Sequence, residues 1–139
     1  MKVKEAMHKG TTCVEPSTPV IDIAKYMRDD DVGAIPVRTD GRLVGIVTDR
    51  DIACRAVTYS GNISKLTAQD IMTKDVTCCS AEDDLVIALK VMEAKKIRRL
   101  PVTDAHKTMI GMLSLGDISH RLSNDLSGEV LRAVSAHHG

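Results

Sequence analysis

Residues 45–52 read GIVTDRDI, and residues 111–118 read GMLSLGDI. Each stretch has a glycine, two apolar residues, a hydroxyl residue and, three positions after the hydroxyl, an aspartate. The similarity extends upstream, where residues 4–52 align with residues 69–118 if one residue is inserted in the second copy. A repeat of this kind decides the architecture before any single motif does, because each copy forms one structural unit. It also implies that any binding site exists as two related copies.

The composition predicts a globular protein with an aliphatic core. The chain has 139 residues, 43% of them hydrophobic, and it contains no Phe or Trp. Lys plus Arg equals Asp plus Glu at 19 each, and a zero net charge argues against nucleic-acid binding, which needs a basic surface. No apolar run approaches the roughly 20 residues of a membrane span, and the N-terminus lacks the apolar region of a signal peptide. We therefore expect a cytoplasmic protein.

Each copy is predicted to fold as β-α-β-β-α, which gives an α+β protein. Apolar residues at i, i+3, i+4 and i+7 predict an amphipathic helix that starts at Thr18 and Pro19 in the first copy. The second copy has the same spacing after an acidic first turn at residues 82–84. Short strands are expected at residues 12–15, 34–38 and 43–47, and at 76–79, 100–103 and 109–113. Short helices are expected at residues 3–7, 49–56, 67–72 and 115–122.

Turn residues and prolines refine this pattern. Asp40-Gly41 predicts a hairpin turn in the first copy. Pro36 and Pro101 are each expected at a sheet edge or a strand start, because proline has no N–H for the ladder. The predicted organisation is a first repeat at residues 1–58, a linker at 59–66, a second repeat at 67–123, and a C-terminal helix and tail at 124–139.

Both copies end in a hydroxyl residue followed three positions later by an acid, Thr48 with Asp51 and Ser114 with Asp117. One interpretation is a capping box, in which the hydroxyl caps a helix and the acid faces the positive end of that helix. The other is a ligand site. Free N–H groups with a hydroxyl can hold phosphate, and an aspartate can accept hydrogen bonds from a ribose diol. Recurrence at equivalent positions favours a paired ligand site in addition to capping.

Together with AIPV at residues 34–37 and RLPV at residues 99–102, these features resemble tandem CBS (cystathionine-β-synthase) domains. The resemblance covers almost all of residues 3–122. The plan is similar to small stand-alone bacterial CBS-pair proteins, including a hypoxia- or dormancy-induced type. It implies two repeats packed with pseudo-two-fold symmetry, a homodimer and no attached catalytic domain. We see no nucleophile-plus-base arrangement, phosphate-binding loop or dinucleotide fingerprint, so we do not expect an enzyme.

The resemblance also implies two clefts between the repeats that bind AMP, ADP, ATP or a related adenosyl compound, with no obligatory cofactor. The aspartates would hold ribose hydroxyls, and the apolar residues would sandwich adenine. The first cleft would use Thr48, Asp51 and Ile46 with Met72, Thr77 and Ile97. The second would use Ser114, Asp117 and Met112 with Met7, Thr12 and Val32.

The copies differ three residues before the shared proline, where the second has Arg98 and the first has Gly33. In the family a basic residue here often reaches phosphate, a task that suits the donor fork of arginine. The alternative is that Arg98 and Arg99 are a solvated surface pair. We predict unequal clefts, with the Ser114/Asp117 cleft the better nucleotide site.

The expected function is therefore a regulatory module that senses an adenosyl ligand. The alternative is a scaffold or stress-associated interaction protein whose clefts are vestigial and which acts through its dimer surfaces. The four cysteines, at positions 13, 54, 78 and 79, are expected to be reduced and buried, with a disulfide at Cys13 or Cys54 as the open alternative. Their spacing does not suggest a metal site. His8, His106 and His120 have no obvious acidic partner in the sequence.

Overall fold

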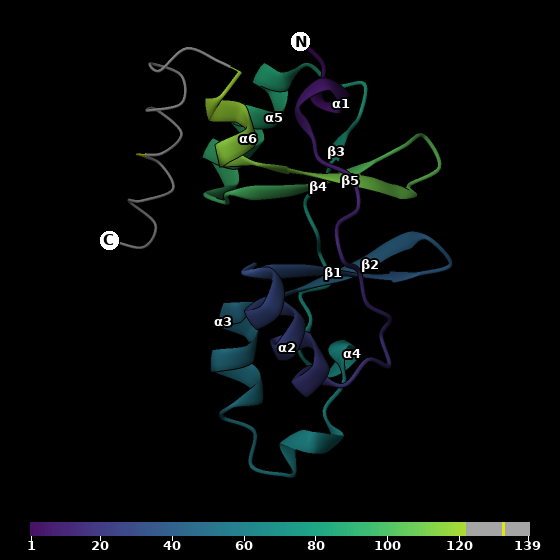
Figure 1. Cartoon of the computed structure of the whole chain (residues 1–139), viewed down its shortest axis with the longest axis vertical. Coiled ribbons are helices and arrows are strands. Elements are labelled where there is room, and N and C mark those ends of the chain that lie inside the picture. The colour runs from purple at the N-terminus through teal and green to yellow at the C-terminus, as the bar shows by residue number, and fades with distance from the viewer. Residues whose placement is uncertain (122–131, 133–139) are drawn as a thin grey trace. The chain divides into compact units, whose positions relative to one another are not determined.

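The first ten residues of the chain fold with its second half. The computed structural model describes residues 1–121 and residue 132, which form two units. The contiguous unit is Thr11–Val76, and the split unit combines Met1–Gly10 with the chain from Thr77 onward. Both units combine helices with a small sheet, so the predicted α+β class is confirmed (Figure 1). The predicted C-terminal helix lies outside the described residues.

The contiguous unit packs its helices against a hairpin. β1 and β2 pair antiparallel, and Val14 adds a single parallel bridge to Val37 in β1. Asp40 and Gly41, with φ of 53° and 79°, form the predicted turn, which uses left-handed conformations at both central positions. The helices lie on one side of the hairpin (Figure 1). Its elements are α2 (Val20–Asp30), β1 (Ala34–Thr39), β2 (Arg42–Thr48), α3 (Asp49–Asp51), the π-helical turn η1 (Ile52–Ala56), η2 (Ile63–Lys65) and α4 (Ala68–Ile71).

The split unit has a three-stranded sheet in the order β3-β4-β5, with β3 parallel to β4 and β4 antiparallel to β5. Its elements are α1 (Val3–Ala6), β3 (Cys79–Ser80), α5 (Leu85–Lys95), β4 (Arg99–Thr103), β5 (Met109–Ser114) and α6 (Leu115–Ser119). α5 and α6 cover the same side of this sheet (Figure 1). Val3 and Ala6 of α1 are buried in the same core as Leu100, Val102 and Leu113. The N-terminal segment is therefore part of the second core and not of the first.

The predicted apolar faces of both long helices are confirmed. The buried residues are Val20, Ile23 and Met27 in α2, and Leu85, Ala88, Leu89 and Met92 in α5. Ala24, predicted on the same face of α2, is half-buried. None of the described helices is long and apolar enough to cross a membrane.

The predicted helix starts are wrong by a small margin. α2 begins at Val20, and Thr18 does not cap it, because the Thr18 hydroxyl accepts the N–H of Glu15 at 3.0 Å. In the second copy the acids precede the helix, so they do not form its first turn. The carboxylate of Asp84 caps α5 by accepting the N–H of Val86 at 3.0 Å.

Two strand predictions also need correction. Residues 12–15 form only the single bridge at Val14, and the strand expected at 76–79 is shorter and shifted to Cys79–Ser80. Pro101 lies in the central strand β4, although an edge or a strand start was expected. The sheet tolerates this proline because β3 begins opposite Val102, so the position without an N–H is not part of the β3–β4 ladder.

The cysteines are less uniformly buried than expected. Cys79 is buried, Cys13 is half-buried, and Cys54 and Cys78 are exposed. Burial, together with the nearby Asp83 and Cys78, raises the pKa of the Cys79 thiol to about 12. Cys79 therefore stays a neutral, poorly nucleophilic thiol near neutral pH.

Alkylation at pH 8 should distinguish these thiols. We expect iodoacetamide to modify Cys54 early and Cys79 last, because Cys79 is both shielded and protonated at that pH. The measurement is peptide mass spectrometry of samples quenched over time, with urea-unfolded protein as the control for full reactivity. Equal rates for Cys54 and Cys79 in the folded protein would contradict the burial described above.

Candidate functional site

Both predicted capping boxes are present and have nearly the same geometry. The Thr48 hydroxyl accepts the Asp51 N–H at 3.1 Å, and Asp51 Oδ2 accepts the Thr48 N–H at 2.9 Å. The Ser114 hydroxyl accepts the Asp117 N–H at 3.0 Å, and Asp117 Oδ2 accepts the Ser114 N–H at 2.9 Å. Each box therefore orients its carboxylate and uses one of the two carboxylate oxygens.

A methionine-containing segment runs beside each box. In the contiguous unit, Thr73 and Ile46 exchange two backbone hydrogen bonds of 2.9 and 3.0 Å. In the split unit, His8 and Met112 exchange two backbone hydrogen bonds of 3.0 Å. These bridges place Met72 and Met7, which precede Thr73 and His8, against β2 and β5.

A glycine makes each close approach possible. A Cβ atom on Gly45 would lie 2.5 Å from Met72 Sδ, and one on Gly111 would lie 2.8 Å from Met7 Sδ. Real Cβ atoms do not approach heavy atoms this closely, so any larger residue would displace the methionine. The glycine that opens each repeated motif therefore leaves space for a thioether against the strand.

The structure brings together four predicted residues in each unit. Ile46, Thr48, Asp51 and Met72 lie in the contiguous unit, and Met112, Ser114, Asp117 and Met7 lie in the split unit. The other members of each predicted set belong to the opposite unit: Thr77 and Ile97 to the split unit, and Thr12 and Val32 to the contiguous unit.

Three of these remaining residues have local roles. The Thr12 hydroxyl donates to Asp30 Oδ2 at 3.1 Å. Val32 packs against the core of the contiguous unit, and Ile97 packs against the core of the split unit.

The alignment of Arg98 with Gly33 holds in three dimensions. The Arg98 carbonyl accepts the N–H of Leu115 at 2.8 Å, and the Gly33 carbonyl accepts the N–H of Asp49 at 2.9 Å. Leu115 and Asp49 each directly follow the hydroxyl residue of a box. The backbone of Arg98 is therefore next to the Ser114–Asp117 box, and Arg98 is an exposed residue.

The two aspartates have different surroundings. Asp51 has 9% of its side-chain surface exposed, and its Oδ1 lies 3.9 Å from Arg55 Nε. The Thr73 hydroxyl lies 3.4 Å from both oxygens of Asp51. Asp117 has 26% of its side-chain surface exposed, and its Oδ2 lies 3.0 Å from His8 Nδ1. Asp51 is thus enclosed by donors, whereas Asp117 presents an accessible edge.

His8 is a site residue that the sequence analysis missed. The expectation that it lacks an acidic partner is wrong, because its partner Asp117 is 109 positions away in the chain. The repeat contained a usable signal: His8 directly follows Met7 as Thr73 directly follows Met72. Comparing these positions would have placed His8 beside the second aspartate.

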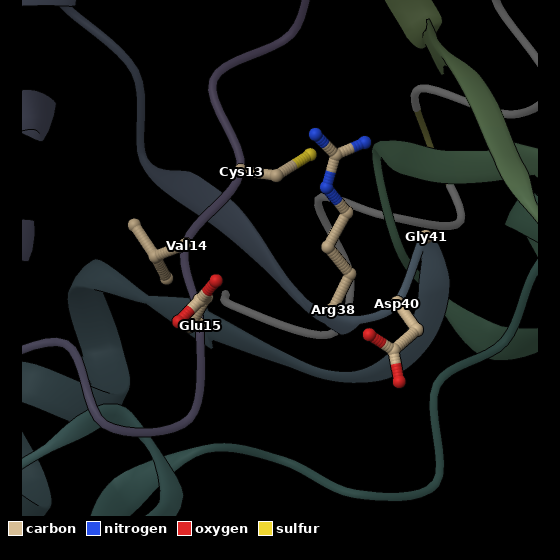
Figure 2. A pocket seen from close by; sticks show the side chains of 6 residues that line it. All are labelled: Cys13, Val14, Glu15, Arg38, Asp40 and Gly41. Carbon is tan, nitrogen blue, oxygen red and sulfur yellow. The ribbon is translucent and has the colours of Figure 1, made fainter.

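A separate hollow of about 420 Å³ lies in the contiguous unit and is lined by Cys13, Val14, Glu15, Arg38, Asp40 and Gly41. Figure 2 shows the Cys13 thiol directed toward the Arg38 guanidinium, and the carboxylates of Glu15 and Asp40 lie farther from that pair. Burial raises the pKa of the Cys13 thiol, and Arg38 opposes that shift only in part. None of the predicted ligand-binding residues lines this hollow.

Metal-ligating side chains are scattered in the part of the chain that the structure describes. Among residues 1–121 and 132, no group of three or more His, Cys, Asp or Glu residues is placed to hold a metal ion.

Comparison with known proteins identifies the family. The model of the CBS domain matches residues 3–56 and residues 68–124. The chain belongs to the CBS domain family. The resemblance inferred from the repeated motif is thereby confirmed, and the chain carries a tandem pair of CBS domains. The matched ranges contain both boxes and the methionine beside each of them.

Two curated relatives of this CBS-domain chain match over nearly their full lengths. CBS domain-containing protein YhcV of Bacillus subtilis is 33% identical over 134 residues, which cover 96% of this chain and 94% of the relative. Hypoxic response protein 1 of Mycobacterium tuberculosis is 30% identical over 132 residues, covering 94% and 92%. The crystal structure of Hypoxic Response Protein I with two coordinated zinc ions matches with a TM-score of 0.80 and 31% identity, covering 88% of this chain and 100% of that one.

Two structures of similar CBS proteins contain adenosyl ligands. CBSX2 in complex with AMP matches with a TM-score of 0.74 and 27% identity, covering 99% of this chain and 98% of that one. The CBS domain pair of MJ0100 in complex with 5′-methylthioadenosine and S-adenosyl-L-methionine matches with a TM-score of 0.75 and 25% identity, covering 86% and 94%.

Proposed function

We propose that this CBS-domain protein is a regulatory module that binds an adenosine nucleotide or a related adenosyl compound. The observation that carries the proposal is the Ser114–Asp117 box. The box holds one carboxylate oxygen of Asp117 with a backbone N–H and leaves part of that side chain exposed. A fixed carboxylate with an open oxygen suits the two hydroxyls of a ribose. The adenosyl ligands of CBSX2 and MJ0100 support this choice of ligand class.

Each neighbouring residue would make a defined contribution to binding. Asp117 Oδ2 is occupied by the Ser114 N–H, so Oδ1 is the oxygen that would accept from ribose. Met7, which is half-buried, would supply the soft apolar surface against which a purine packs, whereas the predicted contact residue Met112 is only 2% exposed. Arg98, beside the box, would bind phosphate through its fork of donors.

The Thr48–Asp51 box is proposed as the weaker site. Asp51 is nearly enclosed, and Thr73 and Arg55 already lie close to its oxygens. A ribose there would have to displace these partners, and Gly33 offers no side chain for phosphate. The two repeats would thus differ in affinity although their boxes share one geometry.

Regulation requires that the ligand bind one conformation of the protein more tightly than another. We propose that ligand occupancy shifts such an equilibrium and that a protein partner responds to it. We also propose that the protein acts as a cytoplasmic homodimer, as the family resemblance implies.

Thermal unfolding with and without ligand tests the function and the ranking of the sites. AMP, ADP, ATP, NAD and S-adenosylmethionine are each added to the wild-type protein and to Asp117→Asn and Asp51→Asn variants. A ligand at 100 times its dissociation constant should stabilise the protein by about 2.7 kcal/mol. We expect Asp117→Asn to lose most of this stabilisation and Asp51→Asn to keep most of it. Asparagine retains an oxygen for the box N–H, so both variants should fold.

Two results would contradict these proposals in different ways. If Asp51→Asn removed the ligand effect and Asp117→Asn kept it, the ranking of the two sites would be reversed. If no adenosyl compound stabilised the wild-type protein, the binding function would fail, and the scaffold alternative would be favoured.

A further inference from the structure

The methionine-containing segments place different side chains beside the two aspartates. The one at Asp117, His8, has an imidazole that can gain or lose a proton, and the one at Asp51 is Thr73. His8 and Thr73 occupy equivalent positions, since each exchanges two backbone hydrogen bonds with the strand beside it. His8 Nδ1 lies 3.0 Å from Asp117 Oδ2, whereas Thr73 presents a hydroxyl to Asp51 at 3.4 Å. A threonine side chain stays neutral at any physiological pH. An imidazole can gain a proton between pH 5 and 8.

Protonation of His8 would alter the site without breaking this contact. A carboxylate only accepts hydrogen bonds, so Nδ1 must carry a hydrogen to bond Asp117 in either charge state. A second proton on the ring therefore adds a positive charge beside Asp117 while the geometry is kept. The carboxylate alone repels an anionic ligand, and a neighbouring imidazolium offsets that repulsion.

Other charged groups lie on the same elements, and their electrostatic contributions have to be distinguished from that of His8. Lys9 directly follows His8. Arg98 precedes β4, and Arg99 is its first residue. His120 and Arg121 follow α6. Lysine and arginine keep their charge between pH 5 and 8, so these four groups contribute a constant field. The α-amino group of Met1 can also change charge in this range, but it lies beside Asp84, at 4.0 Å. Among the described residues, His120 is the other side chain on these elements that can change charge between pH 5 and 8. It therefore provides the matched control.

We propose that His8 makes the Ser114–Asp117 site selective for a phosphorylated adenosyl ligand in a pH-dependent way. The Thr48–Asp51 site lacks this property because Thr73 occupies the equivalent position. The inference rests on the proposed function, since it assigns a regulatory input to the same site. His8 acts here as a positioning residue for Asp117 and as the source of the variable charge.

Isothermal titration calorimetry with AMP and with adenosine at pH 5.5 and pH 8.0 tests the proposal. The proteins are wild type, His8→Asn and His120→Asn. Asparagine keeps an N–H donor near the position of Nδ1 but cannot become charged. The measured quantity is the ratio of the affinity for AMP to the affinity for adenosine. Between pH 8.0 and pH 5.5 this ratio should increase by a factor about five times larger in the wild type than in His8→Asn, as expected for a partly screened charge nearby. The phosphate of AMP also titrates near pH 6, and the comparison between proteins cancels that contribution.

Each outcome bears on a separate statement. His120→Asn should retain the wild-type pH dependence, and its loss in that variant would overturn the assignment to His8. An identical pH dependence in wild type and His8→Asn would overturn the inference and leave the proposed function standing. If the wild type bound neither AMP nor adenosine at either pH, the inference would be overturned, whereas the proposed function would fail only if the other adenosyl compounds also left the protein unstabilised.

Discussion

Replacing Val3 with aspartate is expected to destabilise the split unit by at least about 3–5 kcal/mol, the typical cost of an uncompensated buried charge. Val3 has no exposed surface, and it packs in the core that contains Leu100 and Leu113. Its segment is also fixed by backbone hydrogen bonds to Asp83 and Ala81. The measurement is urea unfolding followed by circular dichroism, with hydrogen exchange to locate the loss in residues 77–121.

The chain offers a matched control for this substitution. Val57 has 68% of its surface exposed, so Val57→Asp makes the same chemical change on the surface and should cost no more than about 0.5 kcal/mol. Equal unfolding midpoints for the Val3 and Val57 variants would show that the N-terminal segment does not contribute to the second core.

Met92→Ala should cost about 2–5 kcal/mol, because truncating a buried methionine removes its contacts and leaves a cavity. Met92 is fully buried in the core of the split unit. Ile87 lies on the same helix with 52% of its surface exposed, so Ile87→Ala is the control and should change stability by no more than about 0.5 kcal/mol. A comparable loss in both variants, measured by urea unfolding, would mean that α5 does not bury the described face.

The repeated motif predicted those parts of the molecule that depend on neighbours in sequence. A hydroxyl and an acid three positions apart can cap the same helical turn, so both boxes were visible in the sequence. The buried faces of α2 and α5 were equally visible, since 3.6-residue periodicity places those side chains on one side. Asp40-Gly41 predicted its turn because both positions need left-handed conformations.

The remaining features depend on contacts that sequence spacing does not encode. Thr18 had the right chemistry to cap α2, but a local turn used its hydroxyl for Glu15. Pro101 appeared to require an edge, yet the late start of β3 allowed a central strand. The pairing of His8 with Asp117 joins residues 109 positions apart, so it became visible only when the chain was folded.

The division of the chain into a contiguous and a split unit has a consequence for its synthesis on the ribosome. All of the contiguous unit, Thr11–Val76, is translated before the strands that the first ten residues need. At about 5–20 residues per second, the N-terminal segment waits on the order of seconds for its core to emerge. During that interval Val3 and Ala6 are apolar side chains without their native partners. The synthesis of the contiguous unit is therefore completed before that of the split unit, although the split unit contains the first residues to be translated.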